Sequence, residues 1–224
     1  VAHCEMVPLV QTDQPNPAEL FQIWLNLPAR NKMVEPHFTM FWREDIAQHV
    51  SRDAAGKTTT VACVAGTLGD ASGLPPPPDS GASQPGSDLA IWTIKMEAGA
   101  RWTLPAAAGA GTRRMLYFFK GAALTVAGHE VAPSSAIELR ANADVELTNG
   151  MEPTELLLLQ GQPLGEPVAQ YGPFVMNTQA EIQQAFVDYR ATEFGGWPWA
   201  SSDPVHPREK GRFARHADGR VETR

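Results

Sequence analysis

The sequence has few cysteines and no long apolar run. Cys4 and Cys63 are the two cysteines among 224 residues, too few and too far apart for the disulfide framework of a small secreted domain. No stretch of about 18 apolar residues occurs, so the sequence predicts no membrane-spanning helix. We therefore expect a soluble protein of a reducing compartment, with the cytoplasm as the default location and no membrane partner.

Positive charge is also scarce. The chain has 18 Lys and Arg against 25 Asp and Glu, a net charge of −7, which argues against nucleic-acid binding because phosphate contacts need a basic excess. The distribution is uneven: residues 205–224 carry six Lys or Arg against three acids, so this tail is +3 and residues 1–204 are −10. Such a tail indicates a solvated segment or one lying over its own acidic body, and binding of an anionic partner is the alternative.

The chain lacks an initiator Met and begins at Val1. We expect that it was cut from something longer, so the absence of a signal peptide carries no information. With 43% hydrophobic residues, its 224 residues can bury a core and form one large or two ordinary domains.

The middle of the chain is rich in short β-type segments. Each is bounded by Gly, Pro, Asn or Asp, at the spacing of an antiparallel sandwich or barrel. The segments are TTTVACVAG, LAIWTIKM, RRMLYFFKG, ALTVAG, AIELRA, DVELTN and TELLLLQG, all between Thr58 and Gly161. Residues 69–88 interrupt them with Gly, Pro, Ser and Asp, which predicts a surface loop, and its PPPP run is alternatively a polyproline ligand. The fold class predicted here is all-β.

Two further elements flank this region. Residues 21–27 (FQIWLNL) alternate apolar and polar side chains and predict a half-buried strand. Near the other end, Thr178 and Glu181 form a capping box. The apolar residues that follow at helical spacing predict one helix, which ends before Gly195.

The first residues, VAHCEM, carry the candidate chemistry. On a strand, residues two apart project to one face, so His3 and Glu5 would point to a common position while Cys4 faces away. Imidazole nitrogen and carboxylate oxygen suit first-row divalent metals, including non-haem iron, if other residues complete the shell. A chance His-x-Glu pair at the ragged start of a strand is the alternative, and Cys4 is interpreted as a small buried hydrophobe.

Three stretches resemble the pirin family of two-domain cupins. They are HCEM, ELFQIWLNLPARNKMVEPHF and GPFVMNTQAEIQQAFVDYRATEFGGWPW. The resemblance covers nearly all of this chain but only the latter part of a family member. It implies double-stranded β-helix (cupin) barrels: a partial N-terminal cupin, a complete C-terminal cupin and one C-terminal helix.

The resemblance also implies a division into parts. Residues 1–42 would be the remnant of the N-terminal, metal-binding cupin and its linker. Residues 43–172 would form the C-terminal cupin, and residues 173–224 the helix and tail that pack between the domains. The second cupin carries no His where a metal-binding cupin has His-x-His, so we expect it to be metal-free and structural.

For the site, the resemblance implies that His3 and Glu5 are metal ligands for Fe(II) or another divalent metal. Two further His ligands are expected in an upstream segment. The implied activity is an iron-dependent dioxygenase of the quercetin 2,3-dioxygenase type, acting on a small flavonol-like aromatic substrate, with Glu5 as the catalytic proton acceptor. A non-enzymatic, metal-dependent regulator that binds a protein partner is the alternative, and a third reading is an inactive fragment. We expect a monomer.

Overall fold

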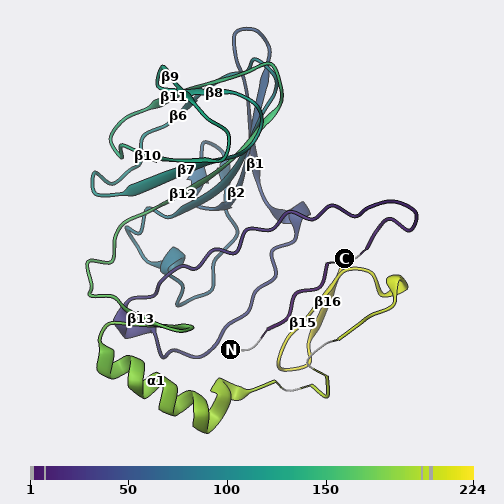
Figure 1. The fold of residues 1–224 in the computed structure, drawn as a ribbon, viewed down its shortest axis with the longest axis vertical. Coiled ribbons are helices and arrows are strands. Elements are labelled where there is room, and N and C mark those ends of the chain that lie inside the picture. The colour runs from purple at the N-terminus through teal and green to yellow at the C-terminus, as the bar shows by residue number, and fades with distance from the viewer. Residues whose placement is uncertain (1–2, 8, 198, 202–203) are drawn as a thin grey trace. The chain divides into compact units, whose positions relative to one another are not determined.

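The computed structural model describes residues 3–7, 9–197, 199–201 and 204–224, and its chain divides into two compact units (Figure 1). Unit 1 comprises residues 1–40 and 166–224, and unit 2 comprises residues 41–165. The domain boundaries predicted from the sequence, after residues 42 and 172, stay a prediction.

Unit 2 is built from antiparallel strands. Its strands are β1 (Gln48–Arg52), β2 (Thr58–Ala65), β3 (Thr67–Leu68), β4 (Ala71–Ser72), β5 (Ala90–Met96), β6 (Arg101–Leu104), β7 (Arg113–Lys120), β8 (Leu124–Val126), β9 (His129–Val131), β10 (Ser135–Leu139), β11 (Val145–Asn149) and β12 (Thr154–Gly161). A six-stranded sheet has the order β1-β2-β5-β12-β7-β10, and a four-stranded sheet has the order β6-β11-β8-β9. All seven strands predicted between Thr58 and Gly161 are confirmed within one or two residues.

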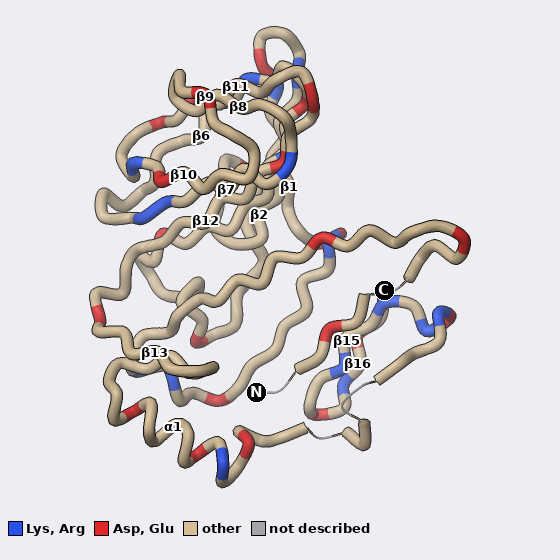
Figure 2. The backbone as a smooth tube through the Cα atoms, in the orientation of Figure 1, with Lys and Arg blue, Asp and Glu red and all other residues tan. Residues whose placement is uncertain are grey.

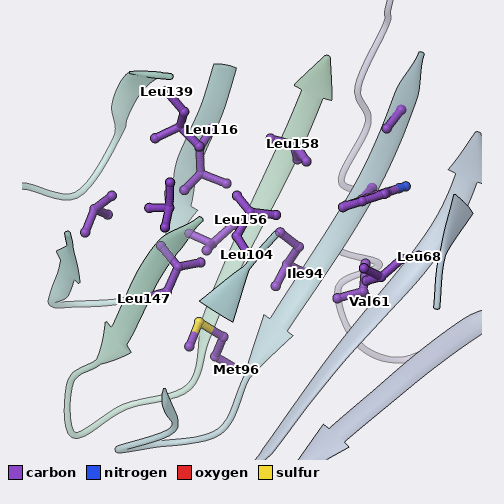
Figure 3. Close-up of a cluster of buried hydrophobic side chains, with 14 of the residues drawn as sticks. Val61, Leu68, Ile94, Met96, Leu104, Leu116, Leu139, Leu147, Leu156 and Leu158 are labelled. Atoms are coloured by element: carbon purple, nitrogen blue, oxygen red, sulfur yellow. The ribbon is translucent and has the colours of Figure 1, made fainter. Parts of the chain in front are cut away.

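The core of unit 2 follows from two-residue alternation along these strands. In β7, Arg114, Leu116 and Phe118 are buried while the side chains between them are half-buried. Strands β5 and β12 contribute further buried residues, among them Ile94 and Leu156. Figure 3 shows Leu116, Ile94 and Leu156 meeting Leu147 of the second sheet in one cluster. The alternation therefore places a continuous apolar layer inside the unit.

Unit 1 contains hairpins and the α-helix. Its elements are β13 (Ala169–Tyr171), β14 (Phe174–Met176), α1 (Gln179–Thr192), β15 (Phe213–Arg215) and β16 (Val221–Thr223). The helix packs against the β13–β14 hairpin, where the ring centroids of Phe174 and Phe186 lie 4.9 Å apart. No helix among the described residues has the length and apolar character needed to cross a bilayer.

The predicted capping box of α1 is confirmed. Thr178 Oγ1 accepts a hydrogen bond from the backbone N–H of Glu181, and the Glu181 carboxylate accepts one from the backbone N–H of Thr178. The helix ends at Thr192, and Glu193 at its C-terminus adopts a left-handed conformation, so the stop precedes Gly195. Thr178 thus fixes the start of α1 by satisfying amides that have no partner within the helix.

Replacing Thr178 by Ala should destabilise α1 by about 1 kcal/mol, because the N-cap acceptor is lost. Hydrogen exchange at the amides of Glu181 and Ile182 measures this effect as faster exchange. The Thr178→Ser variant keeps a hydroxyl acceptor and serves as the matched control. Unchanged exchange in Thr178→Ala would contradict the assigned cap.

The strand predicted for residues 21–27 is wrong. These residues form no strand in the structure, and Trp24 is 65% exposed. Alternation alone does not make a strand, because the backbone N–H and C=O groups of a strand must form hydrogen bonds with a neighbouring strand. Within the described part of the chain, no strand pairs with residues 21–27.

Candidate functional site

The structure brings His3 and Glu5 together at the start of unit 1. His3 Nε2 lies 3.1 Å from Glu5 Oε1, and the two side chains are 62% and 71% exposed. The backbone here is not a strand, so the contact between the two side chains does not come from the strand geometry that the sequence analysis assumed. The Cys4 thiol contacts the Glu5 carbonyl oxygen at 3.8 Å and is exposed, so its interpretation as a buried hydrophobe is wrong.

The donor chemistry of this pair suits a divalent metal, but the number of donors does not. An imidazole nitrogen and a carboxylate oxygen are both ligands for Fe(II). Among the described residues, no group of three or more His, Cys, Asp and Glu side chains is placed to hold a metal ion. His3 and Glu5 alone therefore do not fit an iron centre in this chain, since two ligands leave most of the coordination shell open.

Other histidines are engaged elsewhere. His37 Nε2 lies 3.0 Å from Thr39 Oγ1. His49 Nδ1 lies 2.9 Å from Asp70 Oδ1 in unit 2, and this hydrogen bond is the main cause that lowers the pKa of Asp70. Neither histidine is brought to the His3–Glu5 pair as an additional ligand.

Unit 1 also contains a groove that the sequence did not predict. Its volume is about 890 Å³, within the range of small-molecule sites. Its walls come from the segment before Met33, the β13–β14 hairpin and α1. The main apolar side chains along it are Trp24, Leu25, Leu27, Met33, Phe174 and Phe194. The alternation in residues 21–27 predicts a strand with Trp24 on one face and Leu25 and Leu27 on the other, whereas in the structure all three residues line this groove.

Glu166 holds one wall of this groove in place. One carboxylate oxygen, Oε2, accepts hydrogen bonds from the Ala29 backbone N–H at 2.7 Å and from Asn177 Nδ2 at 2.9 Å. The Ala29 bond is the main cause that lowers the pKa of Glu166, and the Asn177 bond adds to it. The ionised carboxylate thereby joins residues 28–32 to the start of α1.

The interior of unit 2 carries a buried arginine at one end. Arg114 Nε donates to Gln160 Oε1 at 2.9 Å, and one terminal nitrogen donates to the Pro105 carbonyl at 2.7 Å. Burial lowers the pKa of the Arg114 guanidinium, while the carboxylates of Asp88 and Asp144 act in the opposite direction. The expectation that this barrel is metal-free stays a prediction.

The similarity to known proteins agrees with this architecture. Residues 91–195 match the family described as the pirin C-terminal cupin domain. Human pirin is 31% identical over 184 residues, which cover 80% of this chain and 58% of that protein. The chain therefore contains the C-terminal cupin domain of the pirin family. Its fold class is the all-β cupin barrel with a single C-terminal helix, as predicted.

Two further proteins extend the comparison. A Vibrio cholerae protein provisionally named quercetin 2,3-dioxygenase is 36% identical over 201 residues, which cover 87% of this chain and 64% of that protein. The solved structure of a quercetin 2,3-dioxygenase from Acinetobacter baumannii is 31% identical, with a TM-score of 0.64 over 77% of this chain and 55% of that one. The chain thus spans less than two thirds of the length of these pirin relatives.

Proposed function

We propose that this chain belongs to a metal-dependent dioxygenase that acts on a flavonol such as quercetin. The observation that carries the proposal is the His3–Glu5 pair, whose side chains meet at 3.1 Å at the position where the pirin resemblance places a His-x-Glu ligand pair. The similarity to the Acinetobacter baumannii quercetin 2,3-dioxygenase supports the substrate class.

The proposal places the rest of the metal site outside residues 1–224. The pair supplies two donors, and two His ligands in an upstream segment would complete the shell of Fe(II) or another divalent metal. Glu5 is the residue whose carboxylate would accept the proton of a flavonol hydroxyl, because a carboxylate at hydrogen-bonding distance is a competent base.

The cytoplasm remains the proposed location.

The test compares residues 1–224 with a chain that includes the upstream segment, both purified after iron supplementation. We expect near-stoichiometric iron, measured by plasma mass spectrometry, and quercetin-dependent oxygen consumption only in the extended chain. In that chain, His3→Ala should lower iron affinity by more than about tenfold, because removing even an outer-shell partner costs about 10–100-fold. His37→Ala is the matched control and should retain iron, since His37 contacts Thr39 instead.

Each result has a defined meaning. Full iron content in the His3→Ala variant would overturn the ligand assignment. Iron binding that depends on His3 and Glu5, without oxygen consumption on quercetin, would overturn the dioxygenase proposal and favour a metal-dependent regulator. Stoichiometric iron in residues 1–224 alone would contradict the assignment of two ligands to the upstream segment.

A further inference from the structure

The basic tail folds into a hairpin with two different faces. In β15, Ala214 is buried while Phe213 and Arg215 project to the opposite side, because alternate strand residues face opposite ways. The buried side continues into His216, whose ring lies 4.9 Å from that of Phe38. His216 Nε2 also lies 2.6 Å from Glu222 Oε1. One face of the hairpin is therefore packed on other residues of unit 1. The opposite face is directed outward.

The outward face combines cations with aromatic rings. Lys210 Nζ lies 4.2 Å from the centroid of the Phe213 ring. Arg215 Cζ lies 5.4 Å from the centroid of the Trp199 ring, which in turn forms a T-shaped pair with Trp197 at 4.6 Å. These contacts hold the two cations on rigid platforms. We call the set Lys210, Phe213, Arg215 and Trp199 the cation–aromatic face.

The positive charge of this face is not neutralised within the described part of the chain. Besides the Phe213 ring, Lys210 contacts the ring nitrogen Nδ1 of His206 at 3.3 Å, and Arg215 lies over the Trp199 ring. Arg208, in the turn before β15, donates to the neutral Leu9 carbonyl at 2.8 Å. These contacts of the three exposed cations go to aromatic rings, to the His206 ring and to a backbone carbonyl, and none of them is to a carboxylate. Figure 2 shows the Lys and Arg residues along this part of the chain in blue.

The carboxylates of the tail do not offset this face. Glu222 lies on the inner side with His216, and Asp218 accepts the Arg220 backbone N–H within the turn between β15 and β16. Glu209 lies next to Lys210 in sequence, and the turn that contains both residues keeps a net positive charge. Glu222 also forms an ion pair with Arg220 at 3.5 Å, so the contacts of the Glu222 and Asp218 carboxylates go to residues outside the cation–aromatic face.

We propose that the cation–aromatic face binds an acidic peptide segment of a partner protein. Carboxylates form charge-assisted hydrogen bonds with Lys and Arg, and side chains already ordered on aromatic rings lose less entropy on binding. The half-exposed Val221, paired with Arg215 across the hairpin, offers an apolar contact beside the cations. The set therefore fits a segment that alternates acidic and apolar residues.

A nucleic acid fits this face less well than a peptide. Bases bind such surfaces by stacking on free aromatic faces, but here Lys210 and Arg215 already lie over the Phe213 and Trp199 rings. The net charge of −7 on the whole chain also repels a polyanion at long range. A short acidic peptide carries few charges and is less affected by this repulsion.

The experiment measures fluorescence polarisation of a labelled peptide of alternating Glu and Leu at low salt. We expect saturable binding that weakens as salt is added, and a loss of about tenfold in affinity in the Lys210→Gln/Arg215→Gln variant, which corresponds to about 1.4 kcal/mol. The Lys57→Gln/Arg101→Gln variant removes the same charge from exposed residues of unit 2 and should bind within about twofold of the unmodified protein.

Further variants separate the possible causes of a change in peptide affinity. Lys210→Arg/Arg215→Lys keeps both charges and should retain binding, which distinguishes lost charge from a disrupted hairpin. Equal losses in the unit 2 control would show general charge attraction and overturn the proposal, as would the absence of binding. Tighter binding of a labelled oligothymidylate than of the acidic peptide would assign the face to single-stranded nucleic acid instead.

Discussion

Phe118→Ala should lower the free energy of unfolding of unit 2 by about 3–5 kcal/mol. Phe118 is completely buried in β7, which pairs with β12 on one side and β10 on the other. Its ring packs so closely that a Cβ atom placed on Gly121 would lie 3.0 Å from Phe118 Cε2. Truncation removes the apolar transfer energy of the ring and leaves a cavity that paired strands on both sides resist closing.

Urea unfolding followed by the fluorescence of Trp92 measures this loss, because Trp92 lies buried in the same sheet. The matched control is Met151→Ala, since Met151 is 90% exposed and its truncation should change stability by less than about 0.5 kcal/mol. A loss below about 1 kcal/mol in Phe118→Ala would mean that the packing around β7 is looser than the structure describes.

Asn149→Ala should destabilise unit 2 by about 2–4 kcal/mol, because it leaves several buried polar groups without partners. Asn149 Nδ2 donates to the carbonyls of Met96, Glu97 and Glu152 at 3.2, 2.8 and 2.8 Å. Its Oδ1 accepts from Thr154 Oγ1 at 2.6 Å. One buried amide therefore joins the end of β5, the end of β11 and the start of β12.

The neighbouring residue provides the control for Asn149. Thr148 lies on the same strand, is only half-buried, and projects to the opposite face, so Thr148→Ala should cost much less. A double-mutant cycle with Thr154→Val should show coupling of about 0.5–3 kcal/mol between Asn149 and Thr154. Equal unfolding curves for Asn149→Ala and Thr148→Ala would contradict the network.

The Phe118 and Asn149 variants and the metal experiment test different parts of the protein. Phe118 and Asn149 lie in unit 2, whereas His3 and Glu5 lie in unit 1. Loss of iron in His3→Ala should therefore leave the urea unfolding of unit 2 unchanged. A shared loss of both would show that the variant unfolds the chain and would remove His3 as evidence for a ligand.

Local sequence patterns were sufficient to predict those elements whose signals lie within the segment itself. The seven segments between Thr58 and Gly161 alternate strongly and are bounded by turn residues, so their strands are present as predicted. The capping box at Thr178 and Glu181 acts within one turn of helix, and it too is present. Strands β1 and β6 were missed because QHVSR contains a single apolar residue and RWTL alternates over only four residues.

Local patterns failed where the outcome depended on a distant neighbour. Residues 21–27 have the alternation of a strand, but backbone pairing must come from another segment. A metal site that includes His3 and Glu5 would likewise depend on residues from other segments. The two donors lie 3.1 Å apart without a strand to align them, and a complete metal shell requires ligands from elsewhere.

The sequence by itself therefore determined the all-β class and the start of α1, because each depends on residues close in the chain. The tertiary structure decided which strands are neighbours and which side of the basic tail is outward. It placed Arg215 over the Trp199 ring and packed His216 near Phe38. Such contacts between distant residues depend on how the chain folds back, which no local pattern of residues specifies.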